Sequence, residues 1–219
     1  MIVTMTEHHP HDYLPAAQHD ALLPAYDVLS RVLGITKVHQ TLIGQAELAD
    51  GHRVLEIGSG TGSLAIRAKR SHPGADVVGI DPDPLALSRA QRKLHSEKGI
   101  RFEHGYAQKL PYTDAEFDRV LSSLMLHHLD SDAKAAAVAE VFRVLRPGGR
   151  LHLVDADAKV NEQDGRLARF FARRQHAAAH FGDSIPELLG AAGFEWVELS
   201  TRRQPVIGRL AFFSATRPV

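Results

Sequence analysis

A short apolar segment that ends in alternating glycines is the part of the sequence best suited to hold a ligand. Residues 53–63 read Arg-Val-Leu-Glu-Ile-Gly-Ser-Gly-Thr-Gly-Ser, and a helical pattern follows directly. Glycines carry no Cβ, so a turn rich in them lets the backbone approach a bound ligand closely, at the N-terminus of the next helix. The pattern therefore predicts a strand, a tight ligand-binding turn and a helix.

The spacing of these glycines distinguishes two kinds of nucleotide-binding turn. A dinucleotide fingerprint requires glycines at the first, third and sixth positions of the turn. Here Gly58, Gly60 and Gly62 take the first, third and fifth positions, and Ser63 takes the sixth. Glu56 also places a charge two residues before the first glycine, where a strand that served only as core would rarely carry one.

A second acid stands where the next strand ends. Residues 76–81 read Asp-Val-Val-Gly-Ile-Asp, and Asp81 lies 19 residues beyond Gly62. A carboxylate at that place accepts hydrogen bonds from both hydroxyls of a ribose. The alternative role of helix cap suits Asp83 better, because a helix is predicted from about 84 to 98. Pro82 would then lie against an adenine ring.

The elements that must position these residues alternate along the chain. Strands are predicted at 52–58, 76–81, 100–104, 119–123 and 150–155, with helices at 61–71, 84–98 and about 131–145, the last stopped by residues 147–149. Such alternation with continuous apolar strands predicts an α/β fold, a parallel sheet covered by helices on both faces. A helical stretch at 157–192 and β patterns at 194–201 and 209–216 follow.

Length and composition limit the function classes. The 219 residues suit one domain, which we place at 48–219 after an N-terminal arm and cap helices at 1–47, with Gly34 between two helical patterns. A formal net charge of zero gives no attraction to nucleic acid, and no apolar run nears the roughly 18 residues of a membrane span. We therefore expect no nucleic-acid or membrane partner.

Cysteine is absent, which excludes disulfides, thiolate metal ligands and a thiol nucleophile. The N-terminus lacks the pattern of an export signal, so we expect a cytoplasmic location. Its histidines, at positions 8, 9, 11 and 19, have no framework of acids and histidines on one rigid element, and no metal site is predicted there.

The stretch from Glu56 to Gly62 resembles motif I of the class I, Rossmann-like S-adenosylmethionine-dependent methyltransferases of small-molecule type. The resemblance covers about 48–218. It implies a seven-stranded, doubly wound, mostly parallel sheet with a C-terminal antiparallel hairpin and helices on both faces. It also implies that S-adenosylmethionine binds and leaves as S-adenosylhomocysteine. The residues expected around the first half of this cofactor are Glu56, Gly58, Ser59, Gly60, Gly62, Asp81 and Pro82. Residues 26–33 resemble, more loosely, the start of quinone-biosynthesis C-methyltransferases.

The loop expected to bind adenine departs from the family pattern. The family often has Gly-Asp-Ala-x-x-Leu-Pro-Phe there, and its Asp takes the adenine amino group. This chain reads Gly-Tyr-Ala-Gln-Lys-Leu-Pro-Tyr at 105–112. The Tyr106 hydroxyl or ring, or the amide oxygen of Gln108, could take that role beside Ala107, and the alternative is that Tyr106 only packs.

Residues 122–129, Ser-Ser-Leu-Met-Leu-His-His-Leu, resemble the segment after strand four in small-molecule methyltransferases, and Ser123 is expected at the cofactor. His127 or His128 could serve as a general base, since imidazole titrates near neutral pH; a packed or solvated histidine is the alternative. In a strand or extended turn these adjacent side chains would point in opposite directions, and in a helix they would not lie face to face, so we do not expect them to form one metal site. Metal-dependent catechol-type enzymes need an acid where this chain has serines, which indicates a metal-independent reaction.

The resulting prediction is methyl transfer to a small-molecule acceptor by proximity and orientation. The acceptor is expected among residues 123–128, Asp155 and the segments 8–30 and 157–185, in a monomer or homodimer. A non-catalytic S-adenosylmethionine-binding or regulatory module remains an alternative. A nicotinamide-dependent oxidoreductase is a weaker one, because position 63 lacks the required glycine. The sequence does not identify the acceptor or the atom that is methylated.

Overall fold

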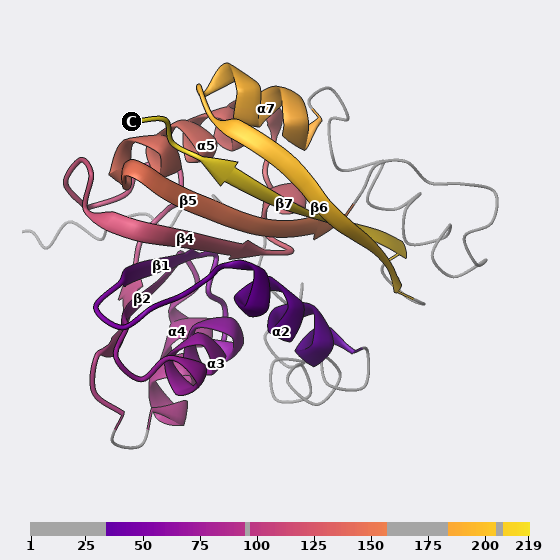
Figure 1. Cartoon of the computed structure of the whole chain (residues 1–219). Coiled ribbons are helices and arrows are strands. Elements are labelled where there is room, and N and C mark those ends of the chain that lie inside the picture. Colours follow the sequence, from indigo (N-terminus) through magenta and orange to yellow (C-terminus); the bar gives the residue numbers. More distant parts are fainter. Residues whose placement is uncertain (1–33, 95–96, 157–183, 205–207) are drawn as a thin grey trace, which may run out of the picture.

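A seven-stranded sheet forms the centre of the computed structural model, which describes residues 34–94, 97–156, 184–204 and 208–219 (Figure 1). The strand order is β3-β2-β1-β4-β5-β7-β6. All neighbouring pairs are parallel except β5 with β7 and β6 with β7. The strands are β1 (Arg53–Ile57), β2 (Asp76–Asp81), β3 (Ile100–His104), β4 (Phe117–Ser123), β5 (Leu145–Ala156), β6 (Glu195–Gln204) and β7 (Gly208–Thr216).

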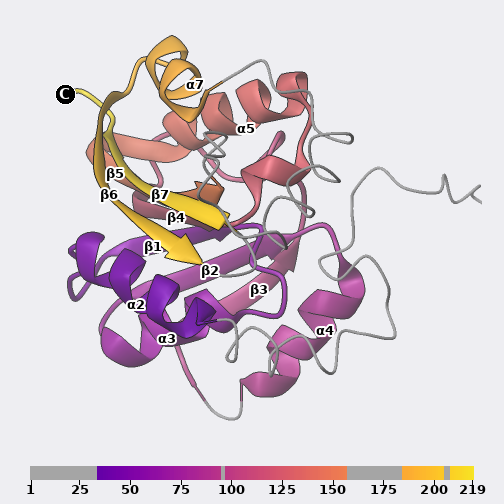
Figure 2. The ribbon, with the colours of Figure 1, turned by 90° about the vertical axis from the view of Figure 1, so that its right-hand side faces the viewer.

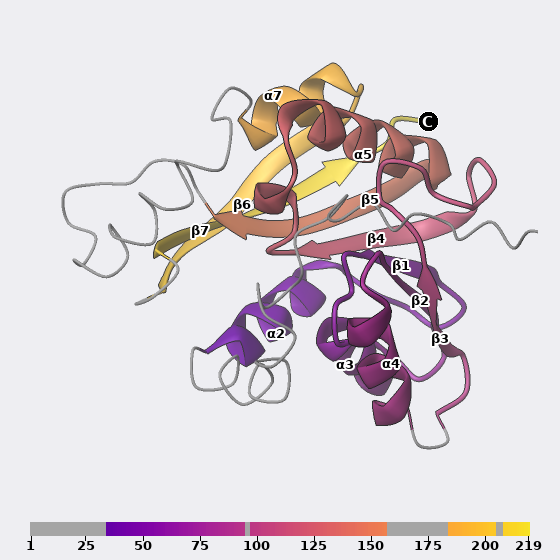
Figure 3. The ribbon, with the colours of Figure 1, turned by 180° about the vertical axis from the view of Figure 1, so that it is seen from behind.

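Helices cover both faces of this sheet (Figures 2 and 3). One face carries α2 (Ile35–Gln45), α3 (Ser63–Ser71) and α4 (Pro84–Lys93), and the other carries α5 (Ser131–Val144) and α7 (Ile185–Ala191). A short 3-10 helix, η2 (Leu126–His128), follows β4. The predicted α/β class and the doubly wound, mostly parallel sheet with its C-terminal hairpin are confirmed.

Two apolar layers hold the helices against the sheet because successive strand residues point to opposite faces. In β1, Leu55 and Ile57 enter the layer under α5 and α7, while Val54 enters the layer under α2, α3 and α4. Glu56 therefore points, with Val54, to the face of α3. An ionisable side chain in an apolar layer is costly unless something compensates it, so this position needs a specific partner.

Aspartates cap the starts of two helices, and the cap at Asp83 is the one expected from the sequence. Asp83 accepts hydrogen bonds from the backbone N–H groups of Leu85 (2.8 Å) and Ala86 (3.2 Å) at the start of α4. Asp130 accepts one from Ala133 at the start of α5. Because Asp83 is the cap, Asp81 is left for another role, as the sequence indicated.

Several predicted boundaries are wrong. The strand expected from residue 150 begins at Leu145 and runs through Pro147, Gly148 and Gly149, because Phe117 of β4 pairs with Leu145 before the register shifts. The helix expected to reach residue 98 ends at Lys93, where Leu94 turns to extended backbone. The helix after the glycine turn begins at Ser63, β4 begins at Phe117, and the terminal hairpin is longer than predicted.

The N-terminal prediction is tested only in part. Residues 1–33 lie outside the described part of the chain, and α2 packs on α3 and β5. The division between residues 1–47 and 48–219 stays a prediction. No helix in the described ranges is long and apolar enough to cross a membrane.

Candidate active site

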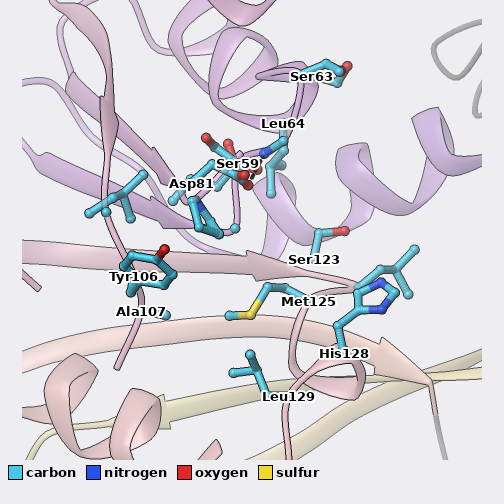
Figure 4. Close-up of a pocket in the computed structure, with 18 of the residues that line it drawn as sticks. Ser59, Ser63, Leu64, Asp81, Tyr106, Ala107, Ser123, Met125, His128 and Leu129 are labelled. Atoms are coloured by element: carbon cyan, nitrogen blue, oxygen red, sulfur yellow. Dashed lines mark hydrogen bonds between the residues drawn. The ribbon is translucent and has the colours of Figure 1, made fainter. Parts of the chain in front are cut away.

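A cavity of about 320 Å³ opens at the carboxyl ends of β1, β2 and β4, where open α/β sheets bind ligands (Figure 4). Most residues singled out from the sequence meet there, although their roles as ligands stay predictions. The lining includes Glu56, Gly58, Ser59, Gly60, Asp81, Pro82, Tyr106, Ala107, Gln108, Ser123 and His128. Gly62 and His127 do not line it.

Gly58, Gly60 and Gly62 all adopt positive φ, but their surroundings differ. A Cβ on Gly58 would lie 2.2 Å from Cγ of Met125, and one on Gly62 would lie 2.4 Å from the ring of Phe102. A Cβ on Gly60 would meet nothing within 4 Å. Gly58 and Gly62 are therefore required for packing, whereas the space beside Gly60 belongs to the cavity. Met125 beside Gly58 itself lines the cavity, whereas Phe102 beside Gly62 does not, and Gly62 accordingly lies outside the lining.

Glu56 has the partner that its buried position requires. Its Oε2 accepts a hydrogen bond of 2.7 Å from the backbone N–H of Ala65, in the first turn of α3. Burial raises the pKa of Glu56 well above its usual range, the Ala65 N–H acts against that shift, and the nearby Asp81 carboxylate adds to it. Glu56 thus ties β1 to α3 and still faces the cavity.

Asp81 connects the end of β2 to the glycine turn. Its Oδ2 accepts a hydrogen bond of 2.7 Å from Gly60 N–H, and its Oδ1 accepts one of 2.9 Å from Asp83 N–H. Burial raises the pKa of Asp81, and these two N–H groups partly oppose the shift. Each carboxylate oxygen has a second lone pair, so the group can accept further bonds from a ligand in the cavity.

Two hydroxyl oxygens in the cavity wall are buried without a hydrogen-bond partner among the described residues. They are Oγ of Ser59, in the glycine turn, and Oγ of Ser123, at the end of β4. A buried polar atom without a partner is costly. The hydroxyl and amino groups of a nucleoside would satisfy them, so the donor and acceptor groups of this cavity fit such a ligand.

The predicted adenine loop is tightly held, in a way that the sequence analysis missed. Tyr106 and Lys109 form an isolated antiparallel bridge, which turns the loop back on itself. Glu140 of α5 accepts a hydrogen bond of 2.7 Å from Leu110 N–H, and Arg143 donates to the carbonyl oxygen of Leu110 at 3.1 Å. An acid and an arginine three residues apart on one helix are the sequence signal for such a clamp, but they are common on solvated faces.

The second missed feature is a close contact between a part-buried histidine of η2 and a buried aspartate of β5. Nδ1 of His127 lies 2.6 Å from Oδ1 of Asp155, and Oδ2 of Asp155 accepts a hydrogen bond of 3.3 Å from His127 N–H. Burial lowers the pKa of His127, but the Asp155 carboxylate outweighs it, and the net shift is upward. The Asp155 carboxylate therefore favours the protonated form of His127 and holds its ring away from the cavity.

His128, in contrast, faces the cavity at the end opposite Tyr106 (Figure 4). The surrounding protein lowers the pKa of His128 by partial desolvation, and the adjacent His127 acts in the same direction, although the His128 side chain stays exposed to the solvent of the cavity. The two histidines lie in the 3-10 helix η2, where their rings are tilted by 41° and not stacked face to face, but the ring centroids are only 4.0 Å apart. The tight 3-10 turn of η2 and the hydrogen bond between His127 and Asp155 hold the two rings close together.

The acceptor side is described only in part. Met125, Leu129 and Ile35 give it apolar walls, but the predicted segments 8–30 and 157–185 lie almost wholly outside the described residues. The N-terminal histidines at positions 8, 9, 11 and 19 lie outside them too. Within the described ranges, no group of three or more His, Asp or Glu side chains is arranged to hold a metal ion.

Comparison with known proteins identifies the family. A family model described as a methyltransferase domain matches residues 54–149. A demethylmenaquinone methyltransferase of Deinococcus radiodurans is 34% identical over 175 residues, which cover 78% of this chain and 71% of the relative.

Solved structures agree on the fold. The YcgJ protein of Bacillus subtilis superposes with a TM-score of 0.68 at 21% identity, over 83% of this chain and 98% of that one. Phosphoethanolamine N-methyltransferase 2 of Haemonchus contortus, solved with S-adenosyl-L-methionine, gives 0.65 at 17% identity, over 84% of this chain and 53% of that one. The chain belongs to the class I S-adenosylmethionine-dependent methyltransferases.

Proposed function

We propose that this methyltransferase acts on a small molecule with an apolar ring or chain, held beside His128 and next to the cofactor. The observation that carries the proposal is the composition of one cavity, which joins the polar groups at the glycine turn to the apolar walls at Met125 and Leu129. The quinone substrate named for the Deinococcus radiodurans relative is of this kind and supports it.

In this proposal the polar half of the cavity holds the cofactor. Asp81 accepts the ribose hydroxyls, Tyr106 or Gln108 meets the adenine edge, and the backbone at Gly60 approaches the amino-acid part, since a side chain is absent there. When bound, S-adenosylmethionine supplies a methyl group already activated by its sulfonium charge. The protein therefore needs mainly to orient the acceptor, and correct orientation can be equivalent to about 10⁵ to 10⁸ M of reactant.

His128 is proposed as the group that accepts a proton from the acceptor. A base whose pKa is lowered to about 4 is too weak to remove a proton from a free hydroxyl group at a useful rate. An acceptor atom that is gaining a methyl group makes its proton strongly acidic, however, and a weak neutral base then suffices. His128 is uncharged at neutral pH, so it can accept that late proton without repelling the sulfonium. His127 and Asp155 act as positioning residues that fix η2.

A non-catalytic cofactor-binding module is less well supported, because the cavity extends beyond the polar half to apolar walls. The family membership also speaks against the nicotinamide-dependent oxidoreductase. The absence of cysteine supports a reducing compartment, and the cytoplasmic location stays a prediction.

Methyl transfer into separated cell extracts tests the proposal. The full chain is incubated with methyl-labelled S-adenosylmethionine and either the low-molecular-mass or the macromolecular fraction. We expect label only in the low-molecular-mass fraction, and little of it with Gly60→Ala, whose new methyl group enters the cavity. Label in protein or nucleic acid, dependent on the wild-type chain, would refute the small-molecule assignment.

A further inference from the structure

β6 is the outermost strand at one end of the sheet (Figure 2), and it carries large apolar side chains that are exposed. Trp196, Val197 and Leu199 are 41%, 52% and 41% exposed. The other large apolar residues as exposed as these in the described ranges, Leu85 and Val219, are isolated from them in sequence. A strand edge of this kind is a template for pairing with another strand.

The exposed side chains lie on both faces of this edge. Trp196 packs edge-on against Phe213, with ring centroids 6.2 Å apart, and Val197 follows it and so points to the opposite face. A helix laid on either face would cover only one of these residues. A further strand, which carries the sheet past β6, would contact both.

The charges of β6 indicate which strand could pair with this edge. Glu195 and Glu198 lie in its first half, and Arg202 and Arg203 in its second half, on the two sides of a register shift between Glu198 and Ser200. An antiparallel second copy of β6 would place the acidic half of each copy beside the basic half of the other. A parallel copy would bring like charges together, which destabilises a strand pair.

We propose that two copies of this chain associate antiparallel through β6 and form one continuous sheet across a two-fold axis. Each apolar residue on the edge then gains a strand neighbour, and the acidic half of each copy lies beside the basic half of the other across the two-fold axis. The residues that line the active-site cavity come from other described elements, so the cavity stays accessible. One strand per copy is a small interface, and we expect a dimer that dissociates on dilution.

A charge-exchange experiment tests the proposal with the full chain. The first variant combines Glu195→Arg with Glu198→Arg, and the second combines Arg202→Glu with Arg203→Glu. In sedimentation velocity over a concentration series, we expect the wild type to dimerise and each variant alone to dimerise about tenfold or more weakly. An equimolar mixture should recover the dimer. The control is Leu85→Glu, a residue 48% exposed on α4, which should dimerise like the wild type.

Circular dichroism melts and S-adenosylhomocysteine titrations will show that the variants fold and bind the cofactor product. A wild type that stays monomeric at all concentrations would overturn the proposal. So would a dimer that neither variant weakens, or a mixture that fails to recover it, since either result places the interface elsewhere. A wild-type dimer weakened by both variants and restored by mixing supports it. None of these outcomes depends on the proposed acceptor.

Discussion

Removal of the Asp81 carboxylate is expected to weaken cofactor binding more than any other single change in the polar half of the cavity. Asp81→Ala would lose charge-assisted bonds to two ribose hydroxyls, each of about 1.5–3 kcal/mol. The sum of about 3–6 kcal/mol corresponds to roughly 10²- to 10⁴-fold in the dissociation constant of S-adenosylhomocysteine. Tyr106→Phe would lose at most one neutral bond of about 0.5–1.5 kcal/mol, or roughly tenfold.

Asp81→Ala would also disturb the glycine turn, and the assay must separate this effect from the loss of ribose contacts. Asp81 also accepts the N–H groups of Gly60 and Asp83, so alanine leaves both donors without this partner and loosens the glycine turn. Asp81→Asn keeps one acceptor oxygen while it removes the charge, and therefore separates the two effects. Isothermal calorimetry gives the affinities, and urea unfolding shows which variants remain folded. If Tyr106→Phe weakened binding as much as Asp81→Asn, the assignment of ribose to Asp81 would be refuted.

Three further predictions concern the turn, the core and the chemistry. Gly62→Ala should destabilise the fold by about 1–3 kcal/mol in urea unfolding, because its Cβ would overlap Phe102. Gly60→Ala should mainly reduce cofactor affinity. A larger loss of stability for Gly60→Ala than for Gly62→Ala would contradict the packing assigned to the turn. His152 is 1% exposed with both ring nitrogens unpartnered among the described residues, and burial, with nearby arginines, lowers its pKa to about 4. Between pH 6.5 and 4 the unfolded chain therefore binds a proton at His152 that the folded chain does not, so the free energy of unfolding falls as the pH drops below 6.5. Between pH 7.5 and 5 the wild type should lose about 2 kcal/mol more of its unfolding free energy than His152→Leu. Equal losses in the two proteins would disprove the role of His152 in this pH dependence. Turnover should not change with EDTA, and restoration by magnesium of an activity that EDTA had abolished would show that the reaction needs a metal.

The fold was predictable where local patterns determine it. The apolar runs of β1 and β2, the glycine turn and the cap at Asp83 are each encoded within a few neighbouring residues, and the strand–helix alternation then requires a parallel sheet. The start of β5 could not be predicted in this way, because Pro147, Gly148 and Gly149 normally signal a turn. Pairing of Leu145 with Phe117, far away in the sequence, continues the strand across them.

The site shows the same division between local and distant information. Gly58, Gly60 and Asp81 carry signals in their spacing. The pairing of His127 with Asp155, 28 residues later, depends on β4 and β5 being neighbours. Both residues were expected near the acceptor, but the sequence did not show that they bind each other. The roles of the two adjacent histidines follow from that contact, which leaves only His128 facing the cavity.

Cofactor binding is the step on which the whole account depends, and one calorimetric comparison tests it most directly. The wild-type chain is titrated with S-adenosylhomocysteine and with NAD at the same concentrations, up to millimolar ligand. The glycines at the first, third and fifth positions of the turn and the carboxylate of Asp81 predict saturable heat from S-adenosylhomocysteine and none from NAD. Heat from NAD, with none from S-adenosylhomocysteine, would contradict the account.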